Sequence, residues 1–173
     1  CVRSPEGNSV IEMRREAAQG RAEFVWGLPA NQLWTAETPF LWRFEARVEA
    51  EDGSIDAESV RFGIRTIAAD PEKGLLVNGA SVKLRGGCVH HDNGPLGACS
   101  WADAERRRVF KLKEAGFNAI RTAHNPPSTA LLEACDALGL YVIDEAFDCW
   151  RQGKLTFHYP QFFEECCERE LST

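Results

Sequence analysis

The sequence has no long apolar segment and no excess of positive charge. No run of about 18 apolar residues occurs, the length from which a membrane-spanning helix is inferred. The formal net charge is −6 and the basic residues form no stripe, which argues against nucleic acid as a partner. With 44% hydrophobic and 27% charged residues, the composition is that of a globular protein, and we expect neither a membrane nor a nucleic-acid partner.

The chain also lacks an initiator methionine, a leader-peptide pattern and paired cysteine motifs. It begins at Cys1, and no charged segment followed by an apolar one opens it, so we expect a cytoplasmic protein. The missing methionine suggests that an upstream part precedes Cys1, although a processed N-terminus would look the same. The seven cysteines are odd in number and contain no C-x-x-C spacing. We therefore expect free thiols rather than a disulfide framework or a zinc site.

The first part of the sequence has the period of β-strands. Residues 42–49 alternate strictly between apolar and polar side chains, which predicts a strand with one buried face. Glu51-Asp52-Gly53 predicts a turn, and the alternation at 60–64 predicts the second arm of a hairpin. The short apolar pieces at 10–11 and 24–26 predict two further strands. Short strands at this spacing favour an antiparallel sandwich, which needs about 100 residues, so we expect residues 1–68 to be a sandwich domain truncated at its N-terminal side.

The pattern changes near residue 69 to strands that alternate with helices, which predicts a parallel sheet. Asn78-Gly79 between two apolar arms predicts a tight hairpin at the start of this part. A complete (β/α)₈ barrel needs about 250 residues, so we expect residues 69–173 to be the N-terminal part of one. The predicted elements are strands near 82–89, 118–122 and 141–143, and helices near 101–115, 128–138 and 160–171.

Polar clusters follow each of the three predicted parallel strands. In a (β/α)₈ barrel the active site is built at the C-terminal ends of the strands. These clusters are therefore the candidate functional residues. They lie at 90–92, 121–125 and 144–148.

Five short segments of the chain are distinctive. They read LWTAETP at 33–39, FGIR at 62–65, NGASVKLRG at 78–86, NAIRTAHNP at 118–126 and DALGLYVIDE at 136–145. In the same order they resemble LWSPENP, FGFR, NGKPVKLRG, NAVRTSHYP and CDEYGLYVIDE, segments of glycoside hydrolase family 2, which includes the β-galactosidases and β-glucuronidases. Each match is moderate alone, but five in order form a strong signal.

The resemblance implies an immunoglobulin-like β-sandwich followed by a (β/α)₈ barrel. The implied activity is that of a retaining exo-β-glycosidase acting on terminal β-linked sugars, with β-galactosides first and β-glucuronides or β-mannosides as alternatives. The family's two catalytic glutamates lie on later strands, the first of them after an asparagine. No Asn-Glu dipeptide occurs in this chain. We therefore expect both glutamates beyond Thr173 and no activity from this chain alone.

The resemblance also implies a sugar pocket at the strand ends, with His90 and His124 as its histidines. Asp92 could accept hydrogen bonds from two neighbouring sugar hydroxyls. Asp144 and Glu145 are neighbours on a strand and point to opposite sides, so we interpret them as supporting carboxylates that pair with arginine, not as the catalytic pair. The predicted substrate-binding residues are His90, His91, Asp92, His124, Asn125, Asp148 and Trp150, and the predicted supporting residues are Arg85, Arg121, Asp144 and Glu145.

Structural interpretations stay open for several of these residues. The 90–92 run could be a solvated loop, His124 could cap the following helix, and Trp150 could pack in a core or stack on a sugar. Residues 106–108, three arginines in a row, are interpreted as a solvated helix face. For the chain as a whole, the alternatives are a non-catalytic carbohydrate-binding module and an inactive truncation product. Unpaired strand edges also leave a homo-oligomer open.

No metal ligand is assigned in this chain. β-Galactosidases of the family place a magnesium-ligating glutamate after the third barrel strand, and counting from Asp144 reaches Cys149 at that position. The run from Asp144 to Trp150 resembles a less characterised bacterial branch of the family. Magnesium therefore stays open for the full-length enzyme, and so does the identity of the sugar.

Overall fold

The computed structural model describes residues 1–28, 32–149, 152–153 and 162–171. It divides the chain into two compact units, Cys1–Val82 and Lys83–Thr173, which are described separately below. This division falls later in the chain than the change of sequence pattern near residue 69. Within the described ranges, no helix has both the length and the apolar character needed to cross a membrane.

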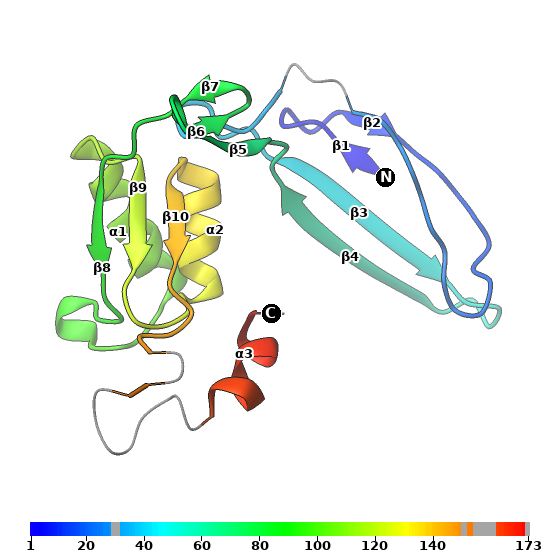
Figure 1. Cartoon of the computed structure of the whole chain (residues 1–173). Helices are drawn as coiled ribbons and strands as arrows, with labels where there is room; N and C mark the ends of the chain where they lie inside the picture. Colours follow the sequence, from blue (N-terminus) through cyan, green and yellow to red (C-terminus); the bar gives the residue numbers. More distant parts are fainter. Residues whose placement is uncertain (29–31, 150–151, 154–161, 172–173) are drawn as a thin grey trace. The chain divides into compact units, whose positions relative to one another are not determined.

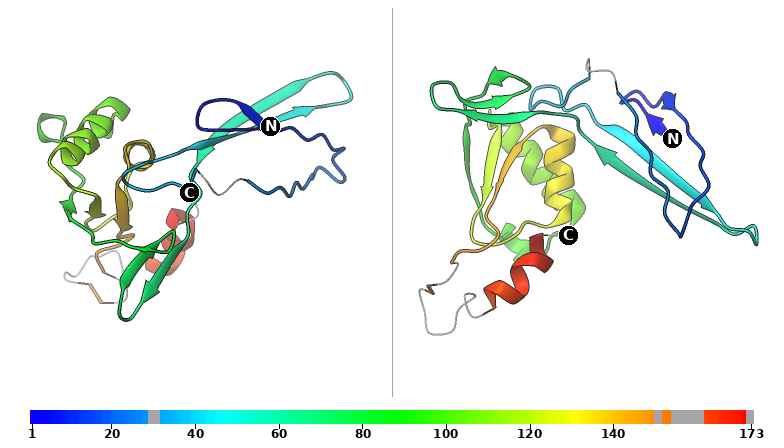
Figure 2. Two further views of the ribbon diagram at one scale, coloured as in Figure 1. Left: turned by 90° about the horizontal axis from the view of Figure 1, so that it is seen from above. Right: turned by 45° about the vertical axis from the view of Figure 1, so that its right-hand side comes forward.

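The first unit contains a four-stranded antiparallel sheet with the order β2-β1-β3-β4. The predicted strand at 42–49 is confirmed as β3, which pairs with β4 from Trp42↔Phe62 to Glu49↔Ile55. The predicted turn between them is stabilised by Asp52, whose Oδ1 accepts the Ser54 N–H at 2.9 Å. Figure 2 shows β3 and β4 side by side as a long two-stranded ribbon. The strands are β1 (Val2–Arg3), β2 (Ser9–Ile11), β3 (Trp42–Glu49) and β4 (Ile55–Phe62).

Two predictions for this sheet need correction. The second hairpin arm ends at Phe62, not Ile64, because the chain leaves the ladder and the Ile64 carbonyl accepts the Trp34 N–H at 2.8 Å. The strand expected at 24–26 is wrong, since that segment forms no strand. The Trp26 ring stacks on Phe44 with centroids 5.6 Å apart. This segment therefore contacts β3 through stacked aromatic rings and not through strand hydrogen bonds.

The sheet is well packed at only one of its ends. Trp34 and Trp42 are fully buried, together with Val2. Towards the other end of the β3–β4 ribbon, Val48 is 64% exposed and Ile55 is 55% exposed. The apolar stripe that the alternation predicts therefore exists, but described residues cover only part of it. A second layer that would complete a sandwich stays a prediction.

A small antiparallel sheet, β5-β6-β7, follows in the same unit. Its strands are β5 (Ile67–Asp70), β6 (Gly74–Val77) and β7 (Ala80–Ser81). The predicted Asn78-Gly79 turn is confirmed, and both residues have positive φ, 52° and 78°, as a two-residue hairpin turn of this kind requires. The second arm is only β7, so the first parallel strand begins at Gly86 rather than near Val82.

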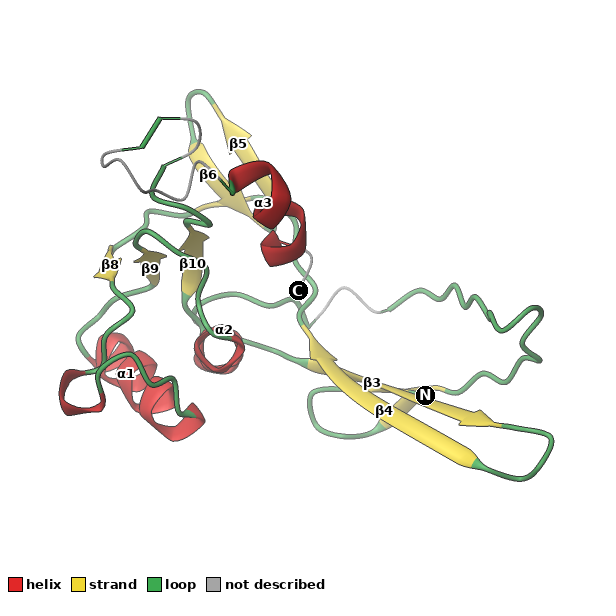
Figure 3. Ribbon diagram, turned by 90° about the horizontal axis from the view of Figure 1, so that it is seen from below, coloured by secondary structure: helices red, strands yellow, loops and turns green. Residues whose placement is uncertain are grey.

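The second unit is a three-stranded parallel sheet with two helices on one face. The strand order is β10-β9-β8, so β9 lies in the centre. Helices α1 and α2 connect the strands and lie on the same face of the sheet (Figures 1 and 3). The predicted alternation of strands and helices is confirmed. The elements are β8 (Gly86–Val89), α1 (Ala102–Glu114), β9 (Ala119–Thr122), α2 (Thr129–Leu138) and β10 (Tyr141–Asp144).

An apolar core fills the space between this sheet and its helices. Val109 of α1, Ile120 of β9 and Leu140 before β10 are each exposed by 2% or less. Burial of side chains of this size contributes about 1.5–3 kcal/mol each. The Cys135 thiol belongs to the same core, as predicted, and burial raises its pKa to about 12. This core holds the C-terminal ends of the three strands in register.

The helix ends follow the local sequence signals with one exception. Ser128 caps α2 by accepting the Leu131 N–H, and Gly139 ends it at a φ of 80°, both as predicted. Helix α1 begins at Ala102 with Trp101, not Ser100, at the N-cap position. The expected last helix is confirmed within the described residues as α3 (Phe163–Leu171). Phe163 packs edge-on against Phe147, with ring centroids 5.5 Å apart.

Candidate functional site

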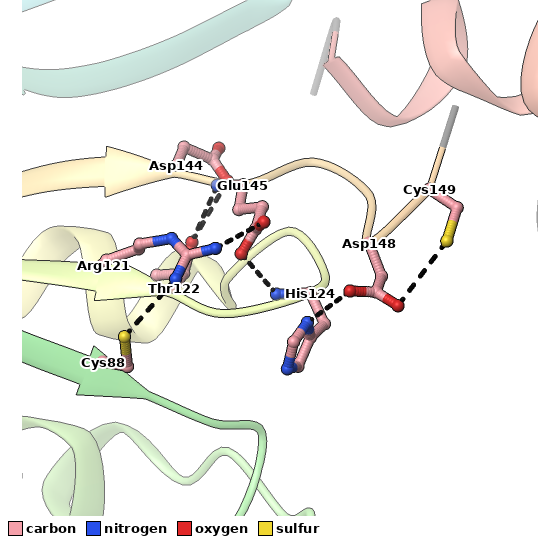
Figure 4. A network of polar contacts seen from close by, with 8 residues as sticks. All are labelled: Cys88, Arg121, Thr122, His124, Asp144, Glu145, Asp148 and Cys149. Atoms are coloured by element: carbon pink, nitrogen blue, oxygen red, sulfur yellow. Dashed lines mark hydrogen bonds and ion pairs between the residues drawn. The ribbon is translucent and has the colours of Figure 1, made fainter. Parts of the chain in front are cut away.

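The C-terminal ends of β8, β9 and β10 bring polar side chains together. Cys88 pairs in register with Arg121, and Arg121 pairs with Ile143. Paired residues of a parallel sheet share a face, and Ile120, one position away, packs into the helix-side core. Arg121 therefore lies on the face away from the helices. Figure 4 shows this polar network at the strand ends.

Arg121 and Glu145 form the centre of the network. Their side chains are joined by an ion pair of 2.6 Å, and Glu145 Oε2 also accepts the His124 N–H at 2.9 Å. The hydrogen bond from His124 and the Arg121 guanidinium hold the pKa of Glu145 below its ordinary value. Glu145 in turn raises the pKa of Arg121. Both groups are therefore charged at neutral pH, and Glu145 has no proton to donate there.

Asp144 and Glu145 point to opposite sides, as the sequence predicted. The Thr122 hydroxyl donates to Asp144 Oδ1 at 3.2 Å, while Glu145 contacts Arg121. The predicted pairing with Arg121 is therefore found for Glu145. A pairing through Arg85 is not found among the described residues. Arg85 comes before β8, at the N-terminal end of the sheet, where its backbone is hydrogen-bonded to Asn118 and Ala119.

His124 has an unusual backbone and two side-chain neighbours. Its φ is 81°, in the left-handed region that non-glycine residues rarely adopt. Its Nδ1 lies 2.7 Å from Asp148 Oδ1, and its ring centroid lies 5.1 Å from that of His90. The contact with Asp148 engages Nδ1, so Nε2 is the ring nitrogen with which His124 could bind a ligand. The alternative role of His124 as a helix cap is wrong, because Ser128 caps α2.

Residues 90–92 form a solvent-exposed segment, and Arg108 of α1 donates hydrogen bonds to its backbone. Arg108 donates to the carbonyls of His90, at 3.5 Å, and of Asp92. The side chain of Arg108 is only 16% exposed and lies 3.6 Å from Glu105, which is 3% exposed. The interpretation of all three arginines at 106–108 as solvated is therefore wrong for Arg108. Its spacing of three from Glu105, beside buried Val109, is the signal that sequence reasoning missed.

A small hollow lies beside this segment within the second unit. Its volume is about 20 Å³, which is enough for a water molecule. Glu105 and Arg108 line it, together with Asn125, a predicted substrate-binding residue. His91 and Asp92 also line it and are solvent-exposed. Trp150, the remaining predicted residue, lies outside the described residues.

The described residues do not fit a magnesium ion. Mg²⁺ takes oxygen ligands in near-octahedral geometry. At the position where family members carry a glutamate, the chain has the buried thiol of Cys149, which donates to Asp148 Oδ2 at 3.7 Å. Within the described ranges, no three His, Cys, Asp or Glu side chains group as a metal site would require.

Two protein-family descriptions match this chain. The family description "Glycosyl hydrolases family 2" matches residues 5–65, and "Glycosyl hydrolases family 2, TIM barrel domain" matches residues 70–164. The chain belongs to glycoside hydrolase family 2. The resemblance stated from the sequence motifs is thereby confirmed, and the two matched stretches correspond to the β part and the strand–helix part.

Individual family 2 proteins match over most of the chain. It is 40% identical to the β-galactosidase BoGH2A of Bacteroides ovatus over 99% of its length. Among solved structures, a family 2 member from Bacteroides cellulosilyticus is 51% identical over 82% of the chain, with a TM-score of 0.75. β-Glucuronidase 3 of Bacteroides uniformis is 29% identical over 99% of the chain, with a TM-score of 0.82.

The chain spans about a fifth of the length of these relatives. It covers 21% of the Bacteroides ovatus enzyme, 18% of the Bacteroides cellulosilyticus structure and 21% of the Bacteroides uniformis structure. Most of each relative therefore has no counterpart in these residues. The activities and substrates of these relatives are therefore attributed to this protein only as proposals.

Proposed function

We propose that this chain is part of a retaining exo-β-glycosidase that hydrolyses terminal β-galactosides. The observation that carries the proposal is the set of family 2 matches, above all the identity along almost the whole chain to a protein named a β-galactosidase. In this proposal, β1–β4 belong to an immunoglobulin-like sandwich and β8–β10 are the first three strands of a (β/α)₈ barrel. The division near residue 68 and a cytoplasmic location remain predictions.

This chain supplies sugar-binding groups in the proposed enzyme, not the catalytic carboxylates. A retaining glycosidase needs two carboxyl groups about 5–5.5 Å apart, one to protonate the leaving oxygen and one to attack the sugar. Asp144 and Glu145 point apart, and the low pKa of Glu145 makes it a poor acid. With the family resemblance, this supports the proposal that both catalytic glutamates lie outside these residues and that the chain alone is inactive.

His90 and His124 are the groups we assign to the sugar itself. Their rings lie side by side at the strand ends, and Asp148 holds Nδ1 of His124 so that Nε2 can meet a hydroxyl. Imidazole nitrogens in this position can exchange hydrogen bonds with sugar hydroxyls as charge develops. Asp92 and Asn125 supply further hydrogen-bonding groups. His91, Asp148 and Trp150 complete the set of residues proposed from the sequence.

The charges near the strand ends favour a neutral sugar over a glucuronide. A glucuronide carries a carboxylate, which calls for a free cationic partner. The two guanidiniums described at this end of the sheet are both committed to carboxylates, Arg121 to Glu145 and Arg108 to Glu105. This neutralisation supports a β-galactoside, with β-mannosides as the neutral alternative.

The test is turnover of nitrophenyl β-galactoside, β-glucuronide and β-mannoside by the full-length protein. We expect the galactoside to be hydrolysed with the highest kcat/KM, and NMR to show the β-anomer as the first product. A preference for the glucuronide would overturn the proposed substrate, and an α-anomer would overturn retention. The 173-residue chain, checked for folding by circular dichroism, should hydrolyse none of the three. Turnover by the chain would place the catalytic carboxylates within it.

A further inference from the structure

Among the described residues, the backbone at His90–Asp92 has no strand neighbour. The ladder between β8 and β9 ends with the Val89 carbonyl, which accepts the Ala123 N–H at 2.9 Å. Beyond that point, the hydrogen bonds found in the described structure to the carbonyls of His90 and Asp92 come from Arg108. The Arg108 guanidinium therefore supplies the hydrogen bonds that a neighbouring strand would otherwise donate to these carbonyls.

The chemistry of arginine suits this task. Its planar guanidinium presents donors on two nitrogens in a fixed fork. Nη1 points to the His90 carbonyl and Nη2 to the Asp92 carbonyl, so one side chain ties down two peptide groups of the same segment. A lysine ammonium is a single point of charge and cannot fix two carbonyls with the same geometry.

Glu105 fixes the arginine in turn. It lies one helical turn earlier on α1, is 3% exposed, and has Oε2 3.6 Å from Arg108 Nη1. Oε2 has no hydrogen-bond partner among the described residues. A carboxylate at this depth is stable as a charge only beside a cation. The buried Glu105 therefore holds the Arg108 guanidinium in the place from which it reaches the loop.

This pair acts on the protein and not on a sugar. The hydrogen bonds that the described structure gives Arg108 go to main-chain carbonyls, and Glu105 is buried beside it. The carbonyls that Arg108 holds belong to the segment whose His90 ring lies 5.1 Å from His124. Moving the segment would move His90 relative to His124.

We propose that Arg108, fixed by Glu105, is a positioning residue that sets the His90–Asp92 segment for sugar binding. The effect on turnover rests on the proposed function, whereas the effect on the segment does not. Displacing groups that bind a substrate by about 1 Å can lower activity by about a hundredfold. Because His90 and Asp92 would contact the sugar before reaction, their displacement should mainly weaken substrate binding.

The experiment compares Arg108→Met, Arg108→Lys and the double variant Glu105→Met/Arg108→Met in the full-length protein. The double variant removes the buried carboxylate together with its partner, so it should fold even if Arg108→Met does not. Arg107→Met, an exposed arginine on the same helix, is the matched control. The readouts are hydrogen–deuterium exchange of residues 88–99, and kcat and KM on the glycoside that the wild type hydrolyses.

We expect the double variant, and Arg108→Met if it folds, to exchange faster at 88–99 and to raise KM about tenfold or more, with a smaller change in kcat. Arg108→Lys should be intermediate, and Arg107→Met should match the wild type. Wild-type exchange at 88–99 in the double variant would overturn the proposal. A fall in kcat at unchanged KM would also overturn it, because simple loss of folded enzyme has that effect. If the wild type hydrolyses no glycoside, the proposed function fails and the exchange at 88–99 alone decides the role of Arg108.

Discussion

Arg121 of β9 and Glu145, the residue after β10, meet at 2.6 Å across the C-terminal ends of two parallel strands. The second carboxylate oxygen of Glu145 accepts the N–H of His124, whose φ is 81°. One carboxylate therefore joins an ion pair on the open face of the sheet to the unusual backbone that presents a histidine. This arrangement makes Glu145 a support for the site and leaves bond cleavage to other groups.

Glu145→Gln should reduce stability in a way that depends on pH. The folded-state pKa of Glu145 lies below its ordinary value of 4.5, so its stabilising effect is complete above that value and is lost as pH falls through the lowered pKa. We expect the difference in thermal midpoint between wild type and Glu145→Gln to be constant near neutrality and to shrink well below 4.5. Glu133→Gln, on an exposed part of α2, is the control and should show no difference. A difference that is the same at every pH would contradict this account.

The positive φ of His124 predicts opposite effects of glycine at two positions. His124→Gly and His124→Ala both lose the contact with Asp148, but glycine adopts a φ of 81° without steric penalty. His124→Gly should therefore be more stable than His124→Ala by about 1 kcal/mol. In α2 the order should reverse, with Ala130→Gly less stable than wild type by about 0.5–1 kcal/mol. Thermal unfolding of the full-length variants measures both. Equal stability of the two His124 variants would show that the backbone is not strained there.

Gly86→Ala should disrupt the sheet of the second unit. A Cβ at Gly86 would lie 2.4 Å from the Ala119 carbonyl oxygen, a main-chain atom that cannot move without breaking the β8–β9 pairing. We expect a loss of about 3 kcal/mol or more, seen as low soluble yield or a lowered unfolding midpoint. Gly87→Ala is the matched control, because its Cβ would lie 3.6 Å from Phe117, an ordinary contact distance. Soluble Gly86→Ala protein with a wild-type midpoint would be incompatible with this register.

The cysteines should differ sharply in their reactivity. Burial raises the pKa of Cys135 to about 12, so almost no thiolate forms at mildly alkaline pH, and only the thiolate is alkylated. Cys88 and Cys99 are exposed and should react first with iodoacetamide. Peptide mass spectrometry after brief labelling measures the order, and labelling in denaturant should remove the protection of Cys135. Labelling of native Cys135 at the rate of Cys88 would contradict its burial.

Local signals in the sequence were sufficient where a single element determines the outcome. Ser128 and Gly139 mark both ends of α2, because a hydroxyl cap and a left-handed C-terminal residue act within one helix. Asn78-Gly79 likewise determines a hairpin turn through two positive φ angles. The strand at 24–26 failed for the opposite reason. Its apolar residues fit a strand locally, but Trp26 finds its partner in the ring of Phe44, which lies far along the chain.

The sequence predicted which polar clusters lie at the strand ends but not the contacts that they make. The polar clusters at 90–92, 121–125 and 144–148 were found because they follow strands whose ends must meet at one edge of a parallel sheet. The spacing of three between Glu105 and Arg108 was the one local signal that set Arg108 apart from Arg106 and Arg107, and it does not show which face of α1 is buried. Only the rotation of α1 against the sheet turns Arg108 and Glu105 inwards and leaves Arg107 in solvent.

Residue order alone was enough to reveal the family, the change from paired strands to strand–helix units, and the positions of the polar clusters. These properties depend on periodicity, turn chemistry and motifs, which are local along the chain. The tertiary structure decided that Glu145 pairs with Arg121, that Asp148 holds His124, and that Arg108 supports the His90–Asp92 segment. Each of these contacts joins groups from different elements, so it depends on how strands and helices pack and not on their order in the sequence.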